Sequence, residues 1–259
     1  MKYKYYSRDF FYSGLLATML ILLVGCASKN YAVSKINTAY IQVDSQLPAN
    51  EEIENFLQPY KEHITNDLSK ILAYNPQDLD KASDKWQNSM TNFYADAILE
   101  IAQLVFEKRT GKKIDFCLLN YGGIRSTIAK GNITTKTAYD IMPFENSAVV
   151  LALTGETVYE LADYIAKNKV AHPLSGIEIY LDKEQQVQKV IINGTEVQKT
   201  QVYYVITNDY LAKGGDKMSF FAKAVEEHLL DYKLRNMFIA YFNTIDTLKP
   251  SVQPRIFFE

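Results

Sequence analysis

Apolar residues recur at helical spacing in several parts of the chain. The clearest run lies between an Asn88-Ser89 cap and a Thr110-Gly111 stop, and it has an apolar residue at every third or fourth position. A cap before such a run and a glycine after it are typical of the two ends of a helix. The same spacing predicts helices over 53–64, 88–111, 154–165 and 233–245.

Other apolar runs have the length of β-strands. Asn193-Gly194 is the strongest short hairpin signal in the chain, and Asp182-Lys183 is a second turn. The predicted strands are Ala39–Val43, Ile114–Leu119, Ser147–Leu153, Ile177–Leu181, Val187–Ile192 and Val202–Thr207. Because helices and strands alternate without repeats or a dividing linker, we expect a mixed α/β (α+β) fold, with helices packed on one sheet or two small ones.

The N-terminal part has the three-part layout of a secretory signal. A basic stretch precedes an apolar run over Phe10–Val24, and Gly25-Cys26 follows. The run is short for a membrane span, which needs roughly 20 apolar residues, so an uncleaved anchor is the less favoured alternative. Leu23-Val24-Gly25-Cys26 resembles the bacterial lipobox, which implies that Cys26 becomes a lipid-bearing first residue. We expect a signal peptide over 1–25, a lipidated tether over 26–37 and one domain over 38–259.

Charge and cysteine content exclude two further interpretations. The formal net charge of −2 lacks the basic excess that a nucleic-acid partner requires. Cys117 is the only cysteine besides Cys26, so we expect no disulfide within the chain. Because Cys117 lies inside an apolar strand, we expect it to behave as a small buried hydrophobic residue.

The sequence predicts no catalytic residue and no metal site in this chain. Metal-assisted hydrolysis needs several Asp, His and Asn side chains that converge. The three histidines lack partners at ligand spacing: His63 is expected on a polar helix, His172 in a loop and His228 in a helix, all three solvated. The motifs of serine nucleophiles and of phosphate-binding loops are missing as well.

Three segments place functional side chains on turns at strand ends, where α/β folds bind ligands. Each turn alone is explained by backbone geometry, because Gly, Asn and Asp favour turns. Together they supply aromatic rings that can stack on a base, a carboxylate that can accept from ribose hydroxyls, and amide and guanidinium groups. The segments are 120–125 (Asn-Tyr-Gly-Gly-Ile-Arg), 143–146 (Pro-Phe-Glu-Asn) and 207–216 (Thr-Asn-Asp-Tyr-Leu-Ala-Lys-Gly-Gly-Asp).

These segments, in this order with 131–134 (Gly-Asn-Ile-Thr) and 153–156 (Leu-Thr-Gly-Glu), resemble the C-terminal domain of bacterial and animal 5′-nucleotidases and UDP-sugar hydrolases. The resemblance extends over most of the chain from Thr38. It implies a 5′-nucleotidase C-terminal domain-like fold that binds a nucleoside. The implied binding residues are Phe144 and Tyr210 on the base, Asn146 at the base edge, Asp216 on the ribose, and Asn120 and Arg125 of the Gly-Gly turn.

Some positions depart from the pattern of that family. The stretch 80–86 lacks the arginines that are common there, and the role is not transferred to Lys81 or Lys85 because lysine lacks a bidentate fork. Tyr121 and Glu145 stand where small residues are common, which changes the expected pocket shape. No segment resembles the family's metallophosphoesterase domain.

The resemblance implies one half of a split 5′-nucleotidase. In this interpretation the chain holds a nucleoside or nucleotide, and a separate metallophosphoesterase chain with two divalent metals cleaves the phosphate ester. The alternative is a non-catalytic membrane lipoprotein that captures nucleosides. Either protein would be attached to a membrane through lipid on Cys26, in the bacterial cell envelope, at the outer membrane facing the periplasm. A purely structural domain is a third interpretation.

Overall fold

The computed structural model describes residues 12, 14–16, 31–44 and 47–259, and Cys26 with most of the expected signal peptide lies outside them. The chain divides into two compact units between Glu51 and Glu52. The predicted strand Ala39–Val43 is wrong, since these exposed residues belong to no strand. An apolar stretch needs a pairing partner as well as β propensity to form a sheet. No helix in the described part is both long and apolar enough to cross a bilayer.

The predicted helix after Pro48 is present as α2 (Glu51–Ser69). Its apolar positions follow helical spacing, yet none of its residues is buried. Phe56 and Tyr60, one turn apart, have their ring centroids 5.7 Å from each other. The spacing therefore predicted the helix correctly and said nothing about whether its apolar side would be covered.

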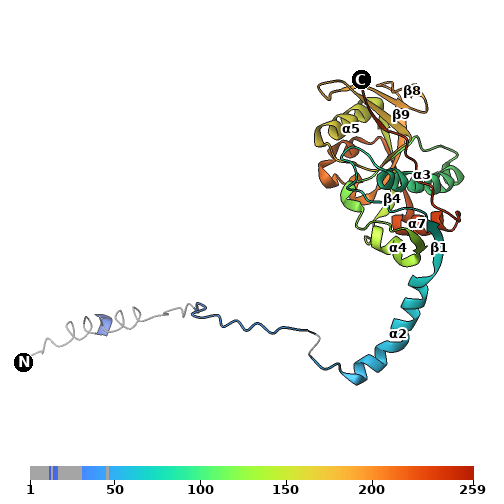
Figure 1. Ribbon diagram of the computed structural model, residues 1–259. Helices are drawn as coiled ribbons and strands as arrows, with labels where there is room; N and C mark the ends of the chain where they lie inside the picture. The colour runs from blue at the N-terminus through green and yellow to red at the C-terminus, as the bar shows by residue number, and fades with distance from the viewer. Residues whose placement is uncertain (1–11, 13, 17–30, 45–46) are drawn as a thin grey trace, which may run out of the picture. The chain divides into compact units, whose positions relative to one another are not determined.

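Within the described residues the strands form three sheets (Figure 1). The central sheet has the order β10-β4-β9-β2-β5, with β2 parallel to β9 and the other pairs antiparallel. Its strands are β2 (Phe116–Leu118), β4 (Ser147–Thr154), β5 (Leu174–Ser175), β9 (Val202–Asn208) and β10 (Glu226–Lys233). The second sheet is β11 (Ile256–Phe258), β6 (Ile177–Leu181), β7 (Val187–Ile192) and β8 (Thr195–Glu196), and the third pairs β1 (Ile71–Asn75) with β3 (Gly131–Thr134). The mixed α/β prediction is confirmed.

Both faces of the central sheet are buried along its inner strands, which explains why β2, β4 and β9 are largely apolar. Along β4, Val150 packs in one apolar cluster while Val149 and Leu151 pack in the other. The first cluster contains α3 (Ser89–Thr110) and α7 (Leu234–Phe242), and the second contains α5 (Gly155–Asn168) and the buried side of β6 and β7. The central sheet is thus a layer between two cores.

The helix ends follow the predicted caps. The Asn88 side chain accepts from the Thr91 backbone N–H, and the Asn88 backbone N–H donates to the Thr91 hydroxyl. Gly111 ends α3 with a left-handed backbone conformation. Thr154 caps α5. Gly155 is required there because a Cβ would lie 2.1 Å from the Gln198 carbonyl oxygen.

The predicted Asn193-Gly194 hairpin is present and joins β7 to the short β8, whereas the strand from Val202 belongs to the central sheet. The expected helical position of His228 is wrong, since this residue lies in strand β10. Strand β10 lies at the edge of its sheet, where polar side chains can face solvent. Its polar and apolar residues therefore do not alternate regularly, and its sequence gives little indication of a strand.

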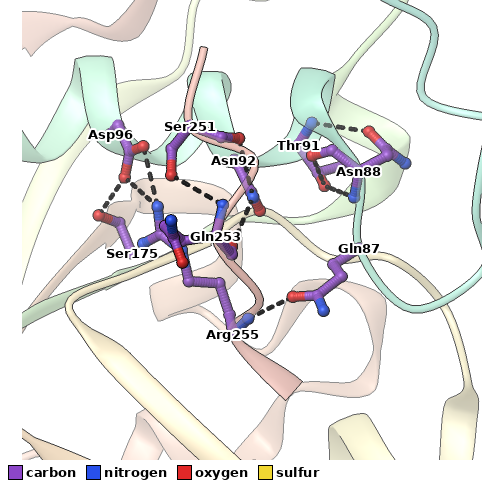
Figure 2. Close-up of polar contacts among 9 residues, drawn as sticks. All are labelled: Gln87, Asn88, Thr91, Asn92, Asp96, Ser175, Ser251, Gln253 and Arg255. Carbon is purple, nitrogen blue, oxygen red and sulfur yellow. Dashed lines mark hydrogen bonds and ion pairs between the residues drawn. The ribbon is translucent and has the colours of Figure 1, made fainter. Parts of the chain in front are cut away.

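The C-terminal segment is fastened to α3 by polar side chains (Figure 2). The Asn92 amide donates to the carbonyl oxygens of Ser251 and Gln253, each at 3.1 Å. Arg255 donates from Nη2 to both carboxylate oxygens of Asp96, at 3.0 and 2.9 Å. These contacts place β11 beside β6, which completes the second sheet.

Candidate functional site

A cavity of about 340 Å³ lies at one end of the central sheet. The six residues expected to bind the nucleoside all line it, together with Gly122 and Gly123: Asn120, Arg125, Phe144, Asn146, Tyr210 and Asp216. The topology accounts for this meeting. Because β2 and β9 are parallel and β4 is antiparallel to β9, the ends of β2 and β9 and the start of β4 lie at the same edge.

Two aromatic rings stand at this cavity with much of their surface exposed. Phe144 is 40% exposed and lies in the turn before β4, while Tyr210 is 46% exposed and lies in α6 (Asp209–Ala212). Gly215 makes room for the Tyr210 ring, since a Cβ there would lie 2.4 Å from the ring atom Cε1. The Arg125 guanidinium carbon lies 5.6 Å from the centroid of the Phe144 ring. The cavity therefore offers apolar ring surface beside a positive charge.

The Asp216 carboxylate is held by two cavity residues. Its Oδ2 accepts from the Asn120 amide at 2.7 Å, and its Oδ1 accepts from the Tyr210 hydroxyl at 2.9 Å. The Asp216 backbone N–H donates to the same hydroxyl at 3.2 Å. Each carboxylate oxygen can accept more than one hydrogen bond. The carboxylate is thus oriented at the cavity and retains acceptor capacity.

Asp216 also has an unusual backbone conformation. Its φ of 52° and ψ of 27° lie in the left-handed region, which Asp tolerates better than most residues that have a Cβ. The Tyr164 hydroxyl donates to the Asp216 carbonyl oxygen at 2.7 Å. Tyr164, on α5, was not among the predicted site residues, because its sequence context indicates only a helix.

The Gly-Gly turn rests on a buried histidine. The Tyr121 backbone N–H donates to Nδ1 of His172 at 3.2 Å. The expectation of a solvated His172 is wrong: the residue is buried, and burial lowers its pKa to about 4, against a smaller opposing effect of the Asp216 charge. A neutral imidazole with a free Nδ1 lone pair is the form that can accept this bond. A loop position before Pro173 gave no sign of this burial.

Lys81 supports the same turn from outside the cavity. Its Nζ donates to the carbonyl oxygens of Ile124, at 2.6 Å, and Tyr121, at 3.4 Å. The ammonium also lies 4.2 Å from the centroid of the Tyr121 ring. Burial and the nearby Arg125 charge lower the pKa of Lys81. Lys81 therefore holds the turn and is not among the residues that line the cavity.

Metal-ligating side chains do not gather in the part of the chain that the structure describes. No group of three or more His, Cys, Asp or Glu residues is suitably placed there. Cys117 is buried in β2, and burial raises the pKa of its thiol well above the usual value. A buried, protonated thiol is a packing group, as the apolar surroundings of Cys117 predicted.

The fold and the cavity define an α/β domain with a cavity at one end of its central sheet. The sequence profile of the 5′-nucleotidase C-terminal domain matches residues 64–223. The chain therefore belongs to the 5′-nucleotidase C-terminal domain family, and the predicted family is confirmed.

Individual relatives agree with this assignment. The chain is 25% identical over 248 residues to the trifunctional nucleotide phosphoesterase protein YfkN of Bacillus subtilis, a match that covers 86% of this chain and 16% of the relative. It is 30% identical over 159 residues to cell wall protein Lmo0130 of Listeria monocytogenes, with 56% and 20% covered. The crystal structure of a 5′-nucleotidase precursor from Thermus thermophilus shares the fold, with a TM-score of 0.65 at 22% identity, over 79% of this chain and 42% of that one. The chain thus spans a fifth or less of the two curated relatives.

Proposed function

We propose that this chain binds the nucleoside part of a nucleotide in the cavity at the sheet edge. A separate metallophosphoesterase chain, with two divalent metals, then cleaves the phosphate ester. The observation that carries the proposal is the arrangement of Asp216 between Asn120 and Tyr210, at a cavity that two exposed aromatic rings also line. Membership of the 5′-nucleotidase C-terminal domain family supports a nucleotide as the ligand.

Each part of a nucleoside has a chemical counterpart in the cavity. Ring stacking on Phe144 and Tyr210 would contribute roughly 1–3 kcal/mol per base. The spare lone pairs of Asp216 can accept from the two vicinal ribose hydroxyls, and Asn146 can donate to and accept from a base edge. Arg125 supplies fixed donors and a positive charge at the same cavity. The cavity volume of about 340 Å³ is in the range of small-molecule sites.

Calorimetric titration of residues 27–259 with adenosine and AMP tests the binding step. Phosphate release is measured in parallel, with divalent metal, for the chain alone and with a metallophosphoesterase chain added. We expect binding without release by the chain alone, and faster AMP hydrolysis by the added chain when both are present. Binding without any effect on the added chain would favour nucleoside capture instead, and no binding would overturn the proposal.

We further propose that lipid on Cys26 attaches the protein to the cell envelope, at the outer membrane facing the periplasm. The Leu23-Val24-Gly25-Cys26 motif supports this attachment, and one relative is named a cell wall protein. Cys26→Ser should move the protein from the membrane fraction to the soluble fraction, because lipid chains provide the membrane affinity. A variant that stays in the membrane fraction would refute the lipid anchor.

A further inference from the structure

The turn that carries Phe144 and Asn146 is held along its whole length by three consecutive residues of another segment. The Lys233 ammonium donates to the Glu145 carbonyl oxygen at 2.6 Å, and the Leu234 backbone N–H donates to the Asn146 carbonyl oxygen at 3.0 Å. Arg235 donates from Nη1 to the Pro143 carbonyl oxygen at 3.3 Å and to that of Phe144 at 3.5 Å. Four consecutive carbonyl groups are thus bound by residues 233–235, here called the 233–235 clasp.

Arg235 is the most enclosed member of the clasp. It is 7% exposed, its guanidinium carbon lies 4.2 Å from the centroid of the Tyr139 ring, and its Nη2 is paired with the Glu145 carboxylate. Among the residues that the structure describes, its Nε is buried and finds no hydrogen-bond partner. A buried guanidinium with one unpaired donor is costly, and apolar residues could fill the same space. The contacts of Arg235 are concentrated on the turn and on the helix that leads into it.

The same turn is connected to the segment of the second ring. The Ser147 backbone N–H, which directly follows Asn146, donates to Oδ1 of Asp209 at 3.1 Å. Asp209 is the first residue of α6, and Tyr210 follows it. The clasp therefore holds the Phe144 turn, which is also bonded to α6, the helix that carries Tyr210. A restraint on the turn thus affects the distance between the two aromatic rings.

We propose that Arg235, with Lys233, is a positioning residue that fixes Phe144 for stacking on the ligand. Residues 143–146 belong to no helix or strand, so their carbonyl groups would otherwise bind water and the turn could take other conformations. A preorganised ring loses less freedom when the ligand binds, which increases affinity without a contact between Arg235 and the ligand. This inference rests on the proposed nucleoside function.

A double-mutant cycle on adenosine affinity tests the proposal. Arg235→Gln should weaken binding roughly three- to tenfold, yet change it less than about twofold when Phe144 is already alanine, because coupled residues are not additive. In an Asp216→Ala background the same substitution should weaken binding by the factor seen in the wild type. Equal effects of Arg235→Gln in all three backgrounds would show a general structural role and overturn the proposal. Arg109→Gln, on an exposed arginine of α3, is the matched control and should leave affinity unchanged.

Hydrogen exchange of the ligand-free protein gives a readout that does not depend on nucleoside binding. Arg235→Gln should speed exchange of the amides of residues 144–147 while those of 120–125 keep their wild-type rates. Arg235→Lys, which retains one charged donor, should restore part of the protection, and Lys233→Met serves if Arg235→Gln does not fold. Unchanged exchange rates in Arg235→Gln would show that the clasp does not restrain the turn, and would overturn the proposal even if adenosine binds. If the wild type does not bind adenosine, the proposed function and the ligand role of the clasp are overturned. Faster exchange in Arg235→Gln would still show that the clasp restrains the turn.

Discussion

Two polar clusters of this domain use similar side chains in opposite ways. At the C-terminal segment, both oxygens of the Asp96 carboxylate accept from Arg255, and Ser175 donates to one of them as well (Figure 2). At the cavity, the described residues supply one side-chain donor to each oxygen of Asp216, whose residue is exposed. In the first cluster the carboxylate accepts mainly from side chains of the cluster itself, whereas in the second the carboxylate keeps acceptor capacity toward the cavity. Polar residues that converge therefore do not by themselves mark a ligand site, and the proposed ligand role of Asp216 depends on the acceptor capacity that it retains at the cavity.

The largest expected effect concerns His172, which is buried and accepts from the Tyr121 backbone N–H in the Gly-Gly turn. Its pKa of about 4 lies below the ordinary value of about 6.5, so the unfolded chain binds the proton more tightly. The contribution of the neutral ring is complete above pH 6.5 and is lost as the pH falls to about 4, by about 3 kcal/mol in total. Urea unfolding of wild type and His172→Gln measures it, because glutamine keeps an acceptor for the Tyr121 N–H without titrating. Parallel pH curves for the two proteins would refute the shift.

Opening the C-terminal cluster should affect stability and leave binding alone. Asp96→Ala removes the partner of Arg255, whose side chain is 13% exposed, and should lower the free energy of unfolding by about 2 kcal/mol. The side chain of Asp96 is itself 31% exposed, which keeps the loss below that of a fully buried pair. Chemical denaturation measures the loss, and adenosine titration is the control. A large fall in affinity at unchanged stability would contradict the division between the two clusters.

Changing the open carboxylate should have the reverse result. Asp216→Asn keeps a residue that tolerates the left-handed backbone and one acceptor, but removes the charge and the second carboxylate oxygen. We expect adenosine to bind about 1–2 kcal/mol more weakly, with the free energy of unfolding changed by less than about 1 kcal/mol. Asp216→Ala should weaken binding by roughly 1–3 kcal/mol, with an added stability loss from the strained backbone. Unchanged affinity in both variants would refute the ribose role.

The two clusters also differ in how far the sequence predicts them. The cavity residues lie on Gly- and Pro-containing turns directly after or before buried strands, so short segments predict both the turns and the sheet edge where they meet. The Asp96–Arg255 pair joins positions 159 residues apart, and neither lies in a recognisable motif. His172 shows the same limit, since a histidine before proline is compatible with solvent or with burial. Local pattern determines local structure, whereas pairing between distant segments depends on how the sheets pack.

The fold follows the same division. Strands buried on both faces and helices with two caps were predicted closely, as β4, β9 and α3 show. The edge strand β10 was missed because one side of an edge faces solvent and accepts Glu226 and Glu227. The Asn193-Gly194 hairpin was predicted, but its second strand was not, because β8 is too short to show a pattern. Burial of a strand on both faces is therefore easier to recognise in the sequence than the position of a strand within its sheet.

The smallest expected effect separates support of the Gly-Gly turn from contact with the ligand. Lys81→Met keeps the alkyl chain on the Tyr121 ring but removes the donors to the carbonyl oxygens of Ile124 and Tyr121. Because these carbonyl groups can turn to water, we expect a stability loss of about 1 kcal/mol and an adenosine affinity only about twofold weaker. Lys81→Arg retains donors and is the control, with stability close to that of the wild type. If Lys81→Met weakened binding as much as Asp216→Ala, the ammonium would act on the ligand itself, and the boundary between turn support and open cavity would have to include Lys81.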